Sequence, residues 1–175
     1  MERIYRMKKR KNLTVLIDTR EQNPYFFGHS KDDPEYKNIS FESAALKTGD
    51  YSIHGMSTPG PGPSITIERK NPADLFQSMG NDRARFEKEW IRMARFDYAA
   101  LVIELDYHSI YAAPPDLSQM RPKSVFRSII AISQRWGIHC FPCRDRGMAE
   151  KTTLIILKRF WEDRKPGGKF DLTNI

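Results

Sequence analysis

The chain has 175 residues, of which 39% are hydrophobic and 29% charged, a composition typical of a soluble protein with one compact domain. No apolar run approaches the roughly 20 residues needed to cross a bilayer. The basic N-terminus has no apolar segment behind it, so we expect neither a membrane anchor nor a secretory signal. The net charge of +7 favours a polyanionic partner. We expect a cytoplasmic protein, nucleoid-associated or, if viral, in the host cytoplasm.

A basic arm opens the chain over residues 1–12. It holds much of the excess positive charge, and we expect it to contact phosphates in a complex that salt weakens. The alternative is a disordered tail that only adds solubility. The side chains expected to bind are Lys8, Lys9, Arg10 and Lys11.

Short β-rich runs follow the arm and predict strands over 13–18, 39–43, 51–53 and 65–69, arranged as a β-meander. Residues 22–37 are polar and aromatic with two prolines, which predicts a long loop. Residues 54–64, HGMSTPGPGPS, predict a mobile hairpin tip between two strands. The alternative for 54–64 is a loop that touches a bound polymer near its reactive bond.

The second half alternates helices and strands. Asn71 fits an N-cap and Pro72 a first helical position, which predicts a helix through Ser78. Helices are also predicted over 82–95, 122–136 and 149–163, and strands over 98–105 and 138–141, with a tail from 165 to 175. The fold class is therefore α/β: a mixed central sheet with an N-terminal β-meander, flanked by helices, in a domain over 13–164.

The triplet Glu68-Arg69-Lys70 ends the predicted strand 65–69. Side chains alternate along a strand, so Glu68 and Lys70 should share one face and Arg69 should point to the other. A carboxylate beside an ammonium can hold a hard cation next to a nucleophilic water, which suits hydrolysis. A solvated strand end is the alternative, because charged triplets are common there.

Further carboxylates accompany strand ends: Asp18 closes the run 13–18, and Asp50 precedes the run 51–53. If Asp18, Asp50 and Glu68 converge at one edge of the sheet, they could bind Mg²⁺, which needs few protein oxygens and keeps several waters. Phosphodiester hydrolysis is the reaction such a site suits, because the metal polarises the phosphoryl oxygen and activates water.

The motifs resemble those of a known family. Gly49-Asp50, Glu68-Arg69-Lys70 and Asp74 are similar to the GD…ERKxxxD signature of the XPF-type nucleases, and Asp18-Thr19-Arg20-Glu21 is similar to their DxRE element. Residues 82–93, DRARFEKEWIRM, resemble the helix after their active site. These are structure-specific DNA endonucleases with a restriction-endonuclease-like fold, and the similarity covers about 13–164.

The resemblance implies residue roles. Asp18, Asp50 and Glu68 would bind Mg²⁺ or Mn²⁺, with Glu21 close by. Lys70 would be the catalytic lysine, supported by Arg69 and Asp74. DNA would be contacted by Arg20, Arg83 and Arg85, although the basic stripe on helix 82–95 could also be a solvated surface.

The resemblance further implies a homodimer formed through the last two helices, for which Ile130, Phe160 and Trp161 could supply apolar surface. These residues could instead fill the core. The pair Cys140 and Cys143 is spaced like a redox motif or half a zinc site, but no second pair exists and we expect ordinary cysteines. No small-molecule cofactor is expected.

Three functions are compatible with the sequence. The first is an endonuclease of branched DNA such as flaps, forks or four-way junctions. The second is a Holliday junction resolvase proper or a nuclease for duplex ends or a sequence. The third is an inactive DNA-binding partner, against which the intact Asp50, Glu68 and Lys70 argue.

Overall fold

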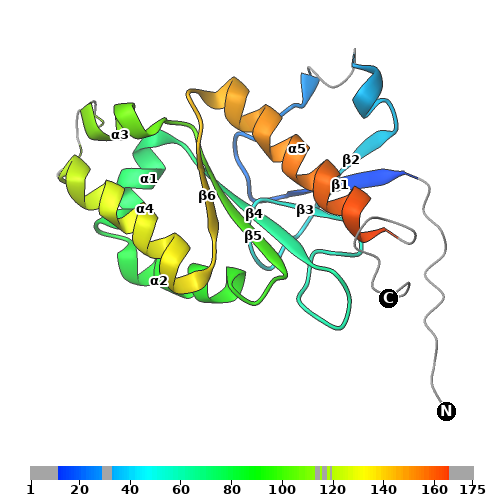
Figure 1. The fold of residues 1–175 in the computed structure, drawn as a ribbon, viewed down its shortest axis with the longest axis horizontal. Coiled ribbons are helices and arrows are strands. Elements are labelled where there is room, and N and C mark those ends of the chain that lie inside the picture. The colour runs from blue at the N-terminus through cyan, green and yellow to red at the C-terminus, as the bar shows by residue number, and fades with distance from the viewer. Residues whose placement is uncertain (1–11, 29–32, 113–114, 116–117, 119, 166–175) are drawn as a thin grey trace.

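A computed structural model of the chain describes residues 12–28, 33–112, 115, 118 and 120–165 (Figure 1). Residues 1–11 of the predicted arm and residues 166–175 of the predicted tail lie outside the described residues. The elements in chain order are β1 Leu13–Asp18, η2 Pro34–Tyr36, β2 Ile39–Ala44, β3 Tyr51–Ile53, β4 Ile65–Lys70, α1 Pro72–Met79, α2 Arg83–Met93, β5 Tyr98–Ile103, α3 Tyr107–Ala112, α4 Pro122–Trp136, β6 His139–Pro142 and α5 Arg146–Arg164.

One mixed sheet of six strands forms the centre of the described fold, in the order β2-β1-β3-β4-β5-β6. Strand β3 pairs antiparallel with both β1 and β4, whereas β4, β5 and β6 run parallel to one another. Strands β1, β4 and β5 therefore point the same way, and their carboxyl ends lie along one edge of the sheet.

The predicted meander differs from the observed one in the place of β2. The antiparallel run is β1-β3-β4, and β2 lies at the sheet edge, parallel to β1 with Leu13 opposite Ile39. A parallel neighbour requires a crossover of a dozen or more residues, and the long connection from 19 to 38 supplies it. The sequence pattern of β2 shows a strand but does not show its direction.

Helices cover both faces of the sheet (Figure 1). Ala100 and Val102 of β5 pack in the cluster with α5, while Leu101 and Ile103 pack with α1, α2 and α4. Along β4, Ile65 and Ile67 belong to the α5 side. Alternation therefore directs Arg69 toward the α5 side, and Glu68 and Lys70 toward the α1 and α2 side.

Most predicted elements are observed within one or two residues, including the strand pair that brackets 54–64. That segment is anchored in the core by Met56, which is 6% exposed.

Helix α3 was not predicted. Helix α5 begins three residues earlier than expected, because Asp145 caps it by accepting a 2.8 Å hydrogen bond from the Met148 N–H. Both cysteines are free. None of the described helices is long and apolar enough to cross a membrane.

Candidate active site

The predicted motifs meet at the carboxyl ends of β1 and β4. The backbone N–H of Asp18 donates to the carbonyl of Asp50 over 2.8 Å, and the N–H of Asp50 donates to the carbonyl of Ile67 over 2.8 Å. These bonds place the turn that carries Asp50 between the ends of the two strands. Segments separated by about fifty residues in sequence thus form one surface.

Gly49 makes this turn possible. Its φ is +72°, in the left-handed region, and a Cβ built there would lie 2.2 Å from Thr66 Oγ1 and 2.9 Å from the Ile67 carbonyl oxygen. A side chain is therefore excluded both by the backbone conformation and by space. The glycine of the GD pair lets Asp50 approach β4.

A cleft with a cavity volume of about 560 Å³ lies over this edge. Its lining includes every residue predicted to be catalytic or to bind metal: Asp18, Glu21, Asp50, Glu68, Arg69, Lys70 and Asp74. Arg20 and Arg85, predicted DNA contacts, also line it. Seven carboxylates and five cationic side chains line the cavity, so its charge is net negative without a bound cation.

Asp50 is held within this charge cluster by a hydrogen bond from the main chain of β4. Its Oδ2 accepts 2.7 Å from the backbone N–H of Arg69. Burial and the nearby charge of Glu68 raise the pKa of Asp50 well above its usual range, and the Arg69 N–H and the Lys70 ammonium oppose this rise only in part. Two neighbouring carboxylates that are partly removed from water are unfavourable as a pair of anions, and a bound cation would reduce their repulsion.

Glu68 and Lys70 share one face, as the alternation predicted. Lys70 Nζ lies 2.6 Å from Glu68 Oε1 and 4.1 Å from the ring centre of Phe86 on α2. Glu68, Arg69 and Lys70 are 8%, 7% and 6% exposed, which excludes a solvated strand end. The ammonium is thus fixed by a carboxylate on one side and an aromatic face on the other.

Asp18 has a different partner. It accepts bonds from the backbone N–H of Arg20 over 3.2 Å and from its Nε over 2.9 Å. Burial acts to raise the pKa of Asp18, but the hydrogen bonds from Arg20 outweigh it and lower the pKa. Arg20 also donates to the carbonyl of Leu46, so it ties the end of β1 to the connection before Gly49.

The donor set for a metal is only partly assembled. Within the described ranges, no group of three or more His, Cys, Asp or Glu side chains is gathered closely enough to hold an ion. Asp50 and Glu68 fit a hard cation, because the charge of one already raises the pKa of the other and Mg²⁺ needs few protein oxygens. The complete set of Asp18, Asp50 and Glu68 stays a prediction.

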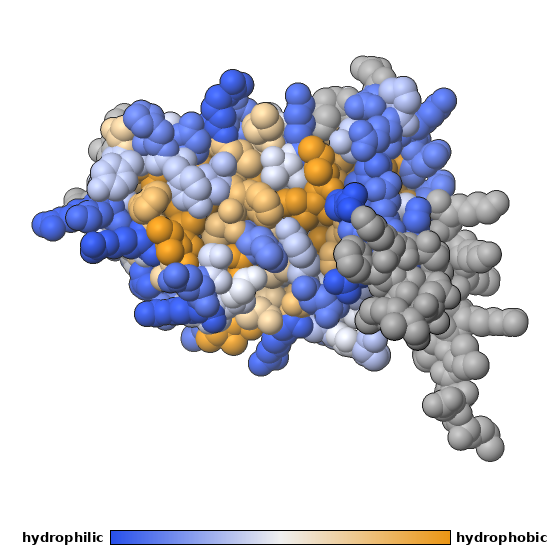
Figure 2. Space-filling view, in the orientation of Figure 1, coloured by the Kyte–Doolittle hydropathy of each residue, from blue (hydrophilic) through white to orange (hydrophobic). Residues whose placement is uncertain are grey.

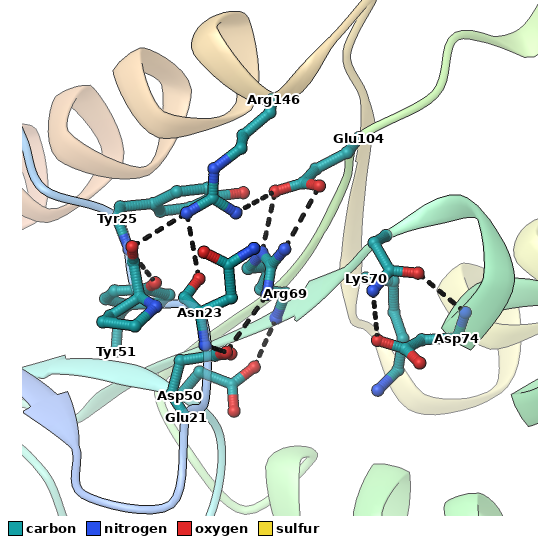
Figure 3. Close-up of polar contacts among 12 residues, drawn as sticks. Glu21, Asn23, Tyr25, Asp50, Tyr51, Arg69, Lys70, Asp74, Glu104 and Arg146 are labelled. Atoms are coloured by element: carbon teal, nitrogen blue, oxygen red, sulfur yellow. Dashed lines mark hydrogen bonds and ion pairs between the residues drawn. The ribbon is translucent and has the colours of Figure 1, made fainter.

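Arg69 lies on the opposite face of β4 and joins two carboxylates (Figure 3). Its guanidinium binds Glu104 with Nε at 2.7 Å and Nη2 at 3.2 Å, and it donates to Glu21 over 3.1 Å. Burial acts to lower the pKa of Arg69, but the bonds to Glu104 and the charges of Glu104 and Glu21 outweigh it and raise the pKa. Arg69 is therefore a permanent cation behind the cleft.

Asp74 stands at the start of α1, beside Lys70 in Figure 3. Asn71 caps this helix as predicted, with its Oδ1 accepting 2.9 Å from the Asp74 N–H. The Asn71 amide in turn donates to Asp74 Oδ2 over 2.6 Å. Asp74 thus lines the cavity and also orders the first turn of the helix that follows the ERK triplet.

Helix α2 forms the far wall of the cavity. Arg85 lines it, but Arg83 is directed to α4, where it donates to Ser128 Oγ over 3.1 Å. Glu89 also lines the cavity and accepts 3.3 Å from the Gly49 N–H, so α2 is bonded to the turn that carries Asp50. The predicted DNA contacts at 8–11 lie outside the described residues.

Sequence reasoning left out several residues that the structure brings to the site: Phe86, Glu89, Glu104 and Arg146. Glu104 had a weak signal, because it is an acidic residue directly after a buried strand. Phe86 also had a signal, because it belongs to the motif 82–93. Nothing local distinguishes Glu89 from its neighbours on a charged helix, or Arg146 from other basic residues.

Comparison with known proteins agrees with the motifs. Residues 17–153 match the ERCC4 domain. XPF from Aeropyrum pernix has a similar fold, with a TM-score of 0.58 and 20% identity over 85% of this chain. XPF from Aeropyrum pernix in complex with DNA gives 0.58 and 19% over 85%.

In both solved structures the match spans 63% of that chain. No relative was found among curated proteins. Because the ERCC4 match extends over most of the sequence, and the overall fold is similar to that of the solved structures, the chain belongs to the ERCC4 domain family and has the XPF-type nuclease fold.

Proposed function

We propose that the chain is a metal-dependent DNA endonuclease that hydrolyses phosphodiesters in branched DNA. The observation that carries the proposal is the cleft in which Asp50, Glu68 and Lys70 meet, with all the residues predicted to be catalytic or to bind metal in its lining. Membership of the ERCC4 domain family supports the chemistry, and the XPF structure solved with DNA supports the polymer.

The net negative cleft supports a requirement for metal. Its carboxylates outnumber its cations, so a phosphate would be repelled until a divalent ion offsets the charge. Asp50 and Glu68 would hold Mg²⁺ or Mn²⁺, with Asp18 assisting directly or through water and the Arg69 carbonyl as a further ligand. The ion would supply polarisation of the phosphoryl oxygen and a more acidic bound water.

Lys70 is the group that acts on the reacting phosphate. With Nζ 2.6 Å from Glu68, the ammonium is held at the cleft surface, where it can donate to the attacking water or to the charge that develops on the phosphate. In-line attack of water on phosphorus breaks the bond to the 3′ oxygen, which takes up a proton. The products are a 5′-phosphate and a 3′-hydroxyl.

A homodimer is proposed through the face that carries α4, β6 and α5. Among the described strands, β6 has a neighbour on one side only. Figure 2 shows apolar residues gathered across the middle of this face. Ile130 on α4 and Ile155 on α5 are 41% and 53% exposed. Of the other residues expected there, Phe160 is buried in the core and Trp161 packs against it. Two sites related by a two-fold axis would suit a four-way junction.

A cleavage assay tests the function directly. Labelled single strand, duplex, 3′-flap, fork and four-way junction would each be incubated with Mg²⁺, with EDTA, and with Asp50→Asn. Metal-dependent cutting of branched forms, lost in the variant, is the expected result. Paired symmetric cuts in the junction would identify a resolvase. Tight binding without cutting would instead support an inactive partner.

A further inference from the structure

A partly buried ion network, with Arg69 and Glu104 at its buried centre, lies behind the cleft on the α5 side of the sheet (Figure 3). Glu104, which follows β5, accepts from Arg69 on one side and from Arg146 Nη1 over 3.1 Å on the other. Glu21 accepts from Arg69 over 3.1 Å. The charges alternate, so each carboxylate has a cationic partner and the set is neutral.

Arg146 extends this network to the segment that follows β1. Its Nη2 donates to the carbonyls of Asn23 and Pro24, over 2.9 and 2.8 Å, and its guanidinium lies 5.0 Å from the ring centre of Tyr25. The planar fork of arginine makes these bonds from two nitrogens held in a fixed geometry, whereas an ammonium would have to reach all three acceptors from a single point. Arg146 thus holds three consecutive residues of the segment.

The segment carries a cavity residue. Glu21 lines the cleft, and its Oε1 accepts 2.8 Å from the Asn23 N–H as well as the bond from Arg69. Farther along, the Tyr25 N–H donates 2.8 Å to the Tyr51 hydroxyl, and the two rings stack with centres 5.1 Å apart. The position of the Glu21 carboxylate therefore depends on where residues 23–25 are held.

Helix stability does not explain the position of Arg146. It is the first residue of α5, where the helix macrodipole disfavours a cation, and the first turn contains no acidic residue. Asp145 already supplies the N-cap. The bonds of Arg146 go to Glu104 and to residues 122 and 123 positions earlier in the chain, not to its own helix.

We propose that Arg146 is a positioning residue of the nuclease site: it tethers residues 23–25 to α5 and, through Glu104 and Arg69, holds Glu21 at the rim of the cleft. The inference rests on the proposed function for its kinetic consequence but not for its structural one. Arg146 is not part of the cleft lining and its carboxylate partner, Glu104, is not either. Loss of Arg146 should therefore lower turnover more than it lowers DNA affinity.

The test compares Arg146→Ala with Arg159→Ala in the full chain. Arg159→Ala removes the same charge from the same helix, but among the described residues the Arg159 guanidinium pairs with Asp163, one turn away on α5, and not with the network. Hydrogen exchange would be followed in peptides covering 19–25, together with kcat and KM on the best-cut branched DNA and the melting temperature. Arg146→Lys, which keeps the charge but lacks the second guanidinium nitrogen that reaches Glu104, is a third variant.

In Arg146→Ala we expect faster exchange confined to 19–25 and kcat lower by on the order of 10- to 100-fold at nearly unchanged KM. Arg159→Ala should match wild type, and Arg146→Lys should be intermediate. Wild-type exchange in 19–25 together with wild-type kcat in Arg146→Ala would overturn the proposal.

Two further outcomes are also decisive. If Arg146→Ala fails to fold, Arg146→Lys decides, and wild-type exchange with wild-type kcat in that variant overturns the tether. If the wild-type chain cuts no DNA, the proposed function fails, whereas the exchange comparison still decides whether Arg146 holds the segment.

Discussion

The carboxylate of Asp50 accepts a 2.7 Å hydrogen bond from the backbone N–H of Arg69, the middle residue of the ERK triplet. This bond joins the side chain of one motif to the main chain of the other, so it does not depend on any side chain on β4. Because Arg69 directs its own side chain to Glu104 on the other face, one residue positions a cleft carboxylate and also anchors the network behind it.

The raised pKa of Asp50 predicts a pH-dependent stability difference between the wild type and Asp50→Asn without metal. At a pH below the usual pKa of an aspartate, Asp50 is protonated in both the folded and the unfolded chain, so its ionisation does not change the free energy of unfolding. As pH rises, the unfolded chain loses this proton first, so wild-type stability falls until the folded pKa is passed. Each unit by which the pKa is raised corresponds to about 1.4 kcal/mol. Asp50→Asn should therefore become the more stable protein toward neutral pH, as measured by urea unfolding at pH 4 to 8.

The same site predicts the response to metal. Millimolar Mg²⁺ should raise the melting temperature of the wild type, because the ion binds the folded cleft and offsets the repulsion between Asp50 and Glu68. The rise should be smaller in Asp50→Asn. Equal melting temperatures with Mg²⁺ and with EDTA in the wild type would count against a carboxylate metal site.

Lys70→Ala is expected to lower kcat by on the order of 100- to 1,000-fold, as loss of a preorganised donor does, with DNA binding largely kept. Phe86→Leu tests how the ammonium is held, because leucine keeps apolar bulk but removes the aromatic face 4.1 Å from Nζ. A cation–π contact contributes about 0.5–2 kcal/mol, so kcat should fall several-fold. Phe86→Tyr is the matched control and should remain close to wild type; equal kcat in all three proteins would contradict the role of the ring.

Gly49→Ala should destabilise the fold and remove cleavage, because the new Cβ would meet Thr66 Oγ1 and the Ile67 carbonyl in a left-handed residue. Strain of this kind costs about 1–3 kcal/mol before the clash is counted. Gly55→Ala has a similar φ of +83° but open space, and Gly62→Ala has open space without that conformation. Melting temperatures should fall in the order Gly62→Ala, Gly55→Ala, Gly49→Ala; similar values for the first and last would show that the turn relaxes.

The cysteines are predicted to be chemically quiet. Burial raises the pKa of Cys140 to about 12, and burial also raises that of Cys143. At pH 7.5 the thiolate is therefore scarce, and modification of the folded protein by iodoacetamide should be slow beside that of the urea-unfolded chain. Rapid labelling of the native protein at either position, read by mass spectrometry, would contradict this.

The apolar face predicts the oligomeric state. A double variant with Ile130→Asp and Ile155→Asp should shift a wild-type dimer to monomer in sedimentation velocity, because both side chains are exposed on the proposed interface. Ile91→Asp, on α2 and 49% exposed, is the control and should leave the dimer intact. A monomeric wild type at micromolar concentration would contradict the proposed homodimer.

Local patterns determined a large part of this protein from sequence alone. Strands β1 and β3 and helix α4 have the predicted bounds, since hydrophobic periodicity and capping act within a few residues. The opposite directions of Arg69 and its neighbours follow from strand alternation. The Asn71 cap and the family itself also follow from short motifs.

Tertiary structure decided what depends on pairing between distant segments. The direction and edge position of β2 depend on which strand it meets, and Arg83 could turn to Ser128 only once α4 was in place. Glu104 and Arg146 joined the site through bonds that span 35 to 123 residues. Such contacts leave no periodic trace in sequence, because a long-range ion pair constrains two positions without constraining the residues between them.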